Sequence, residues 1–269
     1  MNALGTSGGK DSTATALFLI EKEIEFIPVF SDTGWEHEIT LEYLEYLNEK
    51  IFNGKLVTIK SEIYPNGMRD LIKKKKRVPS AKARFCTGPL KTKPMIDWLY
   101  MQNPEIEIVY QGIRAEESKD RADITKYPPR EFADYYNCYV ERPILEWTVQ
   151  QVFNIHKKHN IKPNPLYRMG ASRVGCFPCV MCNHEDLKNV QNFLPEVWDR
   201  VDELEKIAGR SFFPPKYIPK RFHTGFDEKS RKSYPVASDV KKYLAGVESA
   251  GQISFQEPSK CVSIYNLCE

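Results

Sequence analysis

Hydrophobic residues in the first part of the chain form short runs separated by longer stretches of helical periodicity. The runs lie at Ile24–Phe30, Leu56–Ile59 and Ile106–Tyr110, and their length is typical of buried strands. A further, very short strand is expected within Met1–Thr6, ahead of a glycine-rich segment. Pro28 interrupts the first run, where a proline removes one hydrogen bond of a ladder.

Helical patterns fill the intervals between these runs. Leu41, Leu44 and Leu47 recur at helical spacing. The predicted helices of this part span about 11–21, 37–51 and 67–76. Strands that alternate with helices indicate βαβ units. We therefore expect an α/β fold, a Rossmann-like open and mostly parallel sheet with helices on both faces.

The pattern changes from about Trp147 onward. Two more helices are predicted, at about 148–159 and 194–208, with a group of cysteines between them. The chain after them is rich in proline, lysine and aromatic residues, and it contains little strand pattern. We expect two domains, an α/β domain over residues 1–165 and a smaller C-terminal part over 166–269.

Composition narrows the class of protein. With 269 residues, 41% hydrophobic and 28% charged, the chain has the make-up of a soluble globular protein. No apolar run reaches the length of a membrane span, and the N-terminus lacks the pattern of a secretory signal, so a cytoplasmic location without membrane contact is expected. The net charge of +3 identifies no partner, and the oligomeric state is left open.

The segment Ser7–Thr13, SGGKDST, lies between the first short strand and a predicted helix. Glycines let the backbone approach an anion, the first helical turn offers free N–H groups, and Lys10 adds a positive charge. The spacing is neither that of the Walker loop nor that of the dinucleotide fingerprint. The alternative is a glycine-rich turn with an N-capping serine. The residues predicted to bind phosphate are Ser7, Gly8, Gly9, Lys10, Asp11, Ser12 and Thr13.

This segment resembles the PP-loop of the adenine nucleotide α-hydrolases, which bind ATP and break it between the α- and β-phosphates, or bind an adenylated sulfur compound. The following element, Ser31–Gly34, resembles the DTG element of the phosphoadenosine phosphosulfate (PAPS) reductase family. The resemblance implies that Asp32, Thr33 and Gly34 lie near the nucleotide, with Asp32 on ribose or Mg²⁺. Alternatively, Asp32 forms an Asx turn before the next helix.

Further elements of the same family follow in order. The segment Gly112–Arg121, GIRAEESKDR, resembles G-x-R-x-x-E-S-x-x-R, which implies that Gly112 approaches the ligand and that Arg114 and Arg121 face phosphate or sulfate oxygens. Otherwise both arginines are surface charges. Segments 142–148 and 163–167 resemble family segments that we interpret as scaffold. The matches together cover residues 4–182.

Three cysteines, Cys176, Cys179 and Cys182, follow the spacing C-x₂-C-x₂-C. Zinc sites usually show two separated C-x₂-C pairs, so this spacing with a distant fourth ligand favours a [4Fe–4S] cluster over zinc. Unligated thiols are the third alternative. Cys86 is the fourth candidate, because the family also places a cysteine there. Cys138 stands alone and is expected to be a buried packing residue.

Two more cysteines, Cys261 and Cys268, lie close to the C-terminus. The sulfonucleotide reductases carry an E-C-G-[IL]-H segment whose cysteine attacks sulfur, and this segment is absent. Either Cys261 or Cys268 acts as the nucleophile in its place, which requires a thiolate, or both are inert.

Lys10 helps to distinguish between two possible reactions. The reductases generally lack this lysine, whereas the ATP-splitting relatives keep it, so the resemblance favours ATP and Mg²⁺, with Lys10 as a catalytic residue. The first hypothesis is activation of the ATP α-phosphate with sulfur transfer, onto a nucleic-acid acceptor, with a sulfur-donor protein as partner. The second hypothesis is thiol-dependent reduction of PAPS or APS to sulfite, with an electron-donor protein.

A third hypothesis is a non-catalytic nucleic-acid-binding protein. Basic residues gather in two stretches, the second among aromatic rings, which is typical of single-strand binding surfaces. A solvated helix end explains the first stretch equally well. The residues concerned are Lys73–Arg77, Lys82, Arg84, Lys91 and Lys93, and then Lys216, Lys220 and Arg221.

Overall fold

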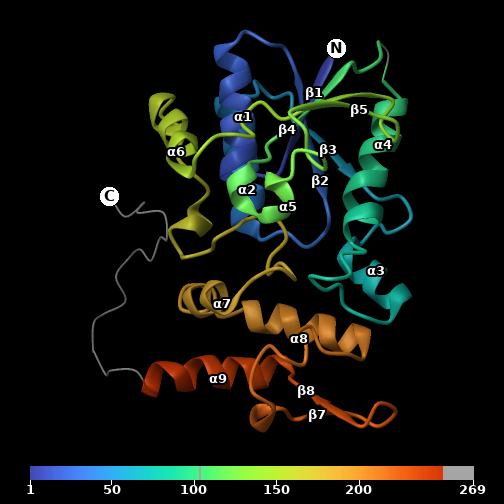
Figure 1. The fold of residues 1–269 in the computed structure, drawn as a ribbon, viewed down its shortest axis with the longest axis vertical. Helices are drawn as coiled ribbons and strands as arrows, with labels where there is room; N and C mark the ends of the chain where they lie inside the picture. The colour runs from blue at the N-terminus through green and yellow to red at the C-terminus, as the bar shows by residue number, and fades with distance from the viewer. Residues whose placement is uncertain (103, 251–269) are drawn as a thin grey trace. The chain divides into compact units, whose positions relative to one another are not determined.

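The computed structural model describes residues 1–102 and 104–250, without the side chains of 247–250, and the chain forms two compact units (Figure 1). Unit 1 contains Met1–Ile63 and Gly88–Pro165. Unit 2 contains Tyr64–Thr87 and the chain from Leu166 onward. The sequence analysis did not anticipate that Tyr64–Thr87 belongs with the C-terminal part.

The described part of unit 1 is built on one sheet with the strand order β3-β2-β1-β4-β6-β5. All neighbouring pairs run parallel except β5 with β6, so the predicted open and mostly parallel sheet is confirmed. The strands are β1 (Asn2–Thr6), β2 (Ile27–Asp32), β3 (Val57–Lys60), β4 (Ile108–Gln111), β5 (Arg130–Ala133) and β6 (Cys138–Glu141).

Helices cover both faces of this sheet because successive strand residues point to opposite sides. Leu4 packs into one hydrophobic cluster with α1 (Lys10–Glu21), α2 (Glu38–Lys50) and α6 (Val149–Lys158). Its neighbour Ala3 packs into a second cluster, which includes residues of α4 (Lys93–Tyr100). Shorter elements join these helices, namely a π-helical turn at Gly88–Thr92, a 3₁₀ turn at Ala115–Glu117 and α5 (Lys119–Ala122).

The order of the strands places a switch point beside β1. The chain leaves β1 through α1 to β2 and β3 on one side, and it returns to β4 on the other side. Open α/β sheets bind ligands outside the carboxyl ends of the strands at such a point. A ligand site is therefore expected at the segments that follow β1, β2 and β4.

Unit 2 is mainly helical in its described part. Its elements are α3 (Met68–Lys75), a 3₁₀ turn at Pro165–Tyr167, α7 (His184–Val190), α8 (Val197–Ala208), a 3₁₀ turn at Lys220–Phe222, the hairpin β7 (Gly225–Asp227) and β8 (Lys232–Tyr234), and α9 (Ala237–Ala250). Arg69 of α3 forms an ion pair with Glu203 of α8, with Nε and Oε1 2.5 Å apart, which ties the inserted segment to the C-terminal part. No helix of the described residues combines the length and apolar character needed to cross a bilayer.

The predicted strands and helices of unit 1 occur within a few residues of their expected places, and the predicted α6 and α8 occur as well. Pro28 is tolerated in β2 because β3 pairs with β2 only from Val29 onward, so Pro28 lies opposite β1 alone. The sequence pattern did not indicate α4, the β5–β6 hairpin, α7 and α9.

Candidate functional site

The loop after β1 is shaped by its two glycines. Gly8 has φ of +67°, and a Cβ there would lie 3.2 Å from a methyl carbon of Thr40. Gly9 is the N-cap of α1 with φ −90° and ψ 158°, and it supplies no side-chain cap. The first turn of α1 is therefore not closed by the usual side-chain acceptor.

The hydroxyl groups of the loop bond to the loop itself. Ser12 Oγ and Thr13 Oγ1 each donate to the carbonyl oxygen of Gly9 at 3.0 Å. The amide of Ser7 donates to Ser12 Oγ at 3.3 Å. Thr13 is fully buried, so it shapes the loop from behind. By contrast, among the described residues no acceptor is found for the amides of Gly8, Gly9, Asp11 and Ser12.

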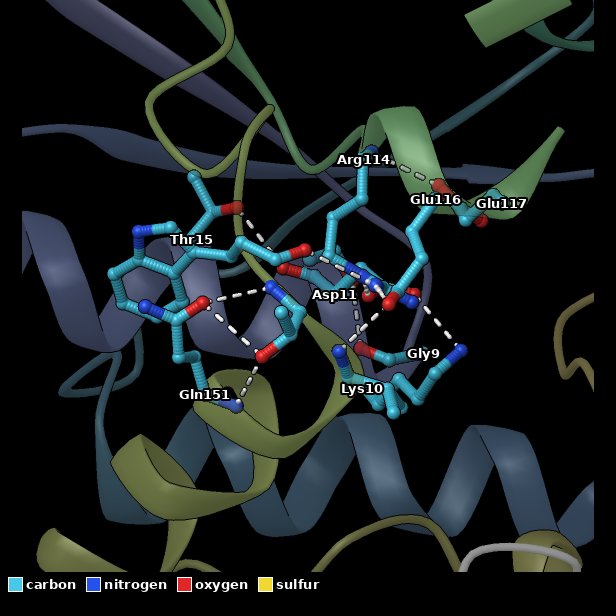
Figure 2. Close-up of polar contacts among 12 residues, drawn as sticks. Gly9, Lys10, Asp11, Thr15, Arg114, Glu116, Glu117 and Gln151 are labelled. Carbon is cyan, nitrogen blue, oxygen red and sulfur yellow. Dashed lines mark hydrogen bonds and ion pairs between the residues drawn. The ribbon is translucent and has the colours of Figure 1, made fainter. Parts of the chain in front are cut away.

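Charged residues meet at the start of α1 (Figure 2). The carboxylate of Asp11 contacts Lys10 Nζ at 3.0 Å and Arg114 Nε at 2.5 Å. Arg114 Nη1 also pairs with Glu116 at 2.6 Å and donates to the carbonyl oxygen of Trp147 at 3.2 Å. Lys10 and Arg114 are only 5% and 4% exposed, so two buried cations share one carboxylate.

These contacts fix the protonation states of the group. Burial alone would lower the pKa of Arg114, but the charge of Asp11 and hydrogen bonds to Asp11 and Glu116 outweigh it and raise the pKa. The hydrogen bond from Arg114 and one from the amide of Val149 lower the pKa of Glu116. The guanidinium and the Glu116 carboxylate therefore both stay charged at neutral pH.

The turn after β2 carries the DTG element. Asp32 accepts the amide of Gly34 at 2.7 Å, which is an Asx turn, and it pairs with Lys60 of β3 at 2.8 Å. The hydrogen bond to Asp32 raises the pKa of Lys60. The buried carboxylate of Glu36 accepts the Thr33 hydroxyl at 2.7 Å and the Thr33 amide at 3.1 Å. The Asx turn is thus present, and contact of Asp32 with a ligand stays a prediction.

The segment after β4 packs directly against the loop. A Cβ on Gly112 would lie 2.7 Å from both Cα and N of Ser12, so only glycine allows this approach. Arg121 lies on α5 and pairs with Glu117. Glu117 in turn accepts the amide of Arg114 at 3.0 Å. The structure thus brings Gly112 and Arg114 to the loop, whereas it places Arg121 beside Glu117.

Three residues of this region were missed by the sequence analysis. Glu36 orders the turn after β2, as described above. His156 of α6 and Asn164 are each 1% exposed and hydrogen-bond to the loop, His156 Nε2 to the carbonyl oxygen of Lys10 at 2.9 Å and Asn164 Nδ2 to that of Gly8 at 3.2 Å. Of the three, only Asn164 was marked in the sequence, because it stands within the segment that resembles a family segment and that we interpreted as scaffold.

The cysteines of the predicted metal site all lie in unit 2. Cys176, Cys179 and Cys182 line one cavity of about 20 Å³, together with Asp186 and Arg173. Burial raises the pKa of the Cys182 thiol. Cys86 is partly buried and belongs to the inserted segment.

The described residues do not by themselves form the predicted metal site. In the described chain no group of three or more His, Cys, Asp or Glu side chains is placed to hold a metal ion. A cavity of about 20 Å³ has room for about one water molecule. Cys261 and Cys268 lie outside the described residues. Cys138 is buried in the core of unit 1, as expected for a packing residue.

Comparison with known proteins adds to this geometry. Residues 2–182 match the phosphoadenosine phosphosulfate reductase domain. An uncharacterized 37.8 kDa protein in the gpa 5′ region of Escherichia phage 186 is 32% identical, with 100% of this chain and 97% of that protein covered. The adenosine 5′-phosphosulfate reductase of Allochromatium vinosum is 32% identical, with 25% of each protein covered.

A solved structure gives the same fold. The phosphoadenylyl-sulfate reductase of Candida auris, solved as a phosphate complex, superposes with a TM-score of 0.52 at 16% identity over 66% of this chain and 83% of that chain. The sheet order, the loop after β1 and the family match agree with one another. This chain belongs to the phosphoadenosine phosphosulfate reductase domain family.

Proposed function

We propose that this chain is a PP-loop enzyme that binds an adenine nucleotide, with ATP as the favoured ligand, at the carboxyl ends of β1, β2 and β4. The observation that carries the proposal is the set of loop amides without acceptors in the described chain (Gly8, Gly9, Asp11 and Ser12) beside the buried ammonium of Lys10. Free amides at the positive end of a helix dipole bind phosphate groups. The phosphate bound in the Candida auris relative supports the same ligand chemistry.

In the proposed reaction a nucleophile attacks the α-phosphorus of ATP, the bond to the bridging oxygen breaks, and pyrophosphate leaves. Mg²⁺, when bound, would neutralise part of the phosphate charge. Lys10 and the loop amides stabilise the charge that develops on the phosphates. Arg114 contributes through Nη2, for which the described residues provide no acceptor. Ser7, Ser12 and Arg121 are proposed as further phosphate contacts, and Asp32, Thr33 and Gly34 as contacts to the nucleoside.

The fate of the activated product is the finer part of the proposal. The adenylylated acceptor is then attacked by a sulfur nucleophile, which a donor protein supplies, and AMP leaves. We propose a nucleic acid as the acceptor, because the exposed lysines of Lys73–Lys76 in unit 2 offer positive charge for its backbone.

Incubation with ATP and Mg²⁺ tests the proposal through the release of AMP and pyrophosphate and through calorimetric binding of ATP. Replacing Lys10 by alanine removes a charge-assisted contact, so we expect ATP affinity to fall about 10- to 100-fold. Lys55→Ala, an exposed lysine of the same unit, is the matched control and leaves affinity unchanged. Equal affinity of the Lys10→Ala variant and the unchanged protein would refute the role of Lys10.

A second candidate function is reduction of PAPS or APS to sulfite. The family match and the similarity to the Allochromatium vinosum reductase favour it. In that reaction a thiolate attacks the sulfur of the sulfonucleotide, the nucleotide leaves as AMP or its 3′-phosphate, and a dithiol reductant releases sulfite. Cys261 and Cys268 are the proposed nucleophiles. Sulfite release from PAPS or APS with a dithiol, without AMP formation from ATP, would establish this function in place of the first.

The iron–sulfur cluster on Cys86, Cys176, Cys179 and Cys182 is a separate proposal. The spacing C-x₂-C-x₂-C and the shared cavity of the last three cysteines support it, although the cavity is too small for a cluster as it stands. We assign no reaction step to it. Iron, sulfide and zinc analysis of anaerobically purified protein distinguishes the cluster from zinc and from unligated thiols.

A further inference from the structure

Three successive carbonyl groups of the loop are each held by a side-chain donor. The carbonyl oxygen of Gly9 accepts from Ser12 and Thr13 of the same loop. Those of Gly8 and Lys10 accept instead from Asn164 and His156, which are 156 and 146 residues away in sequence. All three carbonyl oxygens thus have side-chain donors, while four amides of the loop have no acceptor in the described chain.

His156 is suited only to donate in this place. Its Nε2 lies 2.9 Å from the carbonyl oxygen of Lys10, which can only accept, so the ring carries its proton on Nε2. Nδ1 is buried and has no hydrogen-bond partner among the described atoms. Burial lowers the pKa of His156, so the ring stays neutral at neutral pH.

Asn164 acts on the other side of the glycine pair. Its Nδ2 lies 3.2 Å from the carbonyl oxygen of Gly8 and 3.4 Å from Oγ1 of Thr40. Thr40 is fully buried, and its methyl carbon lies 3.2 Å from the place that a Cβ on Gly8 would occupy. The peptide after Gly8 is therefore held by a donor at its oxygen, and the methyl group of Thr40 leaves little room for any residue other than glycine.

We propose that His156 and Asn164 are positioning residues for anion binding. They hold the carbonyl oxygens of Lys10 and Gly8 away from the ligand, and the loop amides consequently point toward the phosphates of the nucleotide. This inference rests on the proposed function, because it assigns a role toward the phosphate chain bound there. Neither residue contacts the ligand.

A role in holding the loop explains why two polar side chains are buried at these places. A buried amide or imidazole costs free energy unless its hydrogen bonds are made, and a leucine would fill similar space without that cost. Without the two donors the peptide after Gly8 is free to rotate, and the carbonyl group of Lys10 is held only by the first turn of α1. A rotated peptide would turn a partial negative charge toward the phosphate.

Binding of inorganic pyrophosphate, measured by calorimetry alongside ATP, tests the proposal because it isolates the phosphate contacts from the adenine contacts. His156→Leu removes the donor and His156→Gln retains one. We expect pyrophosphate and ATP affinity to fall about 5- to 10-fold in His156→Leu, the equivalent of one hydrogen bond, and to recover in His156→Gln. His159→Gln, on the exposed end of the same helix, is the control and leaves both affinities unchanged.

Asn164→Asp provides an independent test of the proposal if the His156→Leu variant does not fold. This isosteric change replaces the donor by an acceptor, so the carboxylate repels the Gly8 carbonyl and we expect a loss of at least the same size. Wild-type affinity for pyrophosphate in folded His156→Leu or Asn164→Asp protein would overturn this inference and leave the proposed function standing. Failure of the unchanged protein to bind ATP, PAPS, APS and pyrophosphate would instead overturn the proposed function.

Discussion

The loop of unit 1 and the cysteine region of unit 2 differ in how far the protein itself has built a site. Around the loop, each carbonyl from Gly8 to Lys10 has a side-chain donor, and two buried cations share the carboxylate of Asp11. Around the cysteines, three thiols share a small cavity but do not form a group placed for a metal within the described residues.

The difference shows what a sequence motif determines. A glycine loop between a strand and a helix acts through its own backbone, so its geometry follows from local sequence and a few packing contacts. A metal site acts through side chains from distant segments and is completed by the ion, because metal binding and folding are coupled. Substitutions in the two regions test this difference.

Replacing Arg114 by alanine should have the largest effect. It leaves the buried carboxylate of Asp11 with Lys10 as its remaining partner of opposite charge in the described site. Removal of one partner from a buried pair costs about 3–5 kcal/mol of unfolding free energy. Urea unfolding followed by circular dichroism measures the loss. Arg130→Ala, which breaks the exposed pair with Glu141, serves as the control and should cost less than about 1 kcal/mol.

Replacing Gly112 by alanine comes next. Its added Cβ would overlap the backbone of Ser12, so the start of α1 must move. Overpacking of this kind costs about 1–3 kcal/mol of stability, and we expect calorimetric ATP affinity to fall as well because the loop amides are displaced. Gly88→Ala meets no atom within 4 Å and should change neither quantity. Unchanged ATP binding in the Gly112 variant would place the ligand away from this loop.

Acidification should weaken unit 1 through His156. The folded protein lowers the pKa of this ring below its unfolded value of about 6.5, so the unfolded chain takes up a proton first as the pH falls. The stability is complete above about pH 7 and declines below it, by at most about 1.4 kcal/mol per pH unit. Chemical unfolding at several pH values measures the slope.

The charged groups that act on this ring are Lys10, which opposes protonation, and Asp11, which favours it. His156→Gln should flatten the slope below pH 6.5, whereas His159→Gln should leave the contribution of His156 in place. An identical slope in the unchanged protein and in His156→Gln would show that another group controls the pH dependence.

The smallest effect on nucleotide binding is expected from the cysteines. Cys176→Ser should leave ATP affinity within about twofold, because Cys176 belongs to unit 2 and the loop belongs to unit 1. Under the cluster proposal it should nevertheless lower the bound iron. Cys138→Ala, a buried cysteine outside the set, controls for general loss of stability. A large loss of ATP affinity in Cys176→Ser would show that the two regions act together.

Much of unit 1 could be predicted because its physical causes are local. The run ending at Phe30 and the periodicity of Leu41, Leu44 and Leu47 depend only on neighbouring residues, and they marked β2 and α2. The β5–β6 hairpin was missed because β5 exposes Phe132 and lacks a buried apolar run. The grouping of Tyr64–Thr87 with unit 2 rests on a long-range pair, Arg69 with Glu203, which no local pattern indicates.

The site could be predicted in part for the same reason. The loop was found because glycine at a strand end marks a close approach of the backbone, and Gly112 was found because its segment resembles a family element. His156 was missed because a single histidine in an amphipathic helix gives no sign of its contact, 146 residues away in sequence. The burial of Arg114 against Asp11 was missed as well, since pairing across 103 residues depends on the sheet order.

A titration of ¹⁵N-glycine-labelled protein with ATP and Mg²⁺, followed by amide NMR, detects nucleotide binding at the loop amides themselves. We predict that the resonances of Gly8 and Gly9 shift and saturate together with ATP binding, while that of Gly54, remote from the loop in sequence and exposed, stays in place. Saturable ATP binding that leaves the Gly8 and Gly9 resonances unmoved would contradict it.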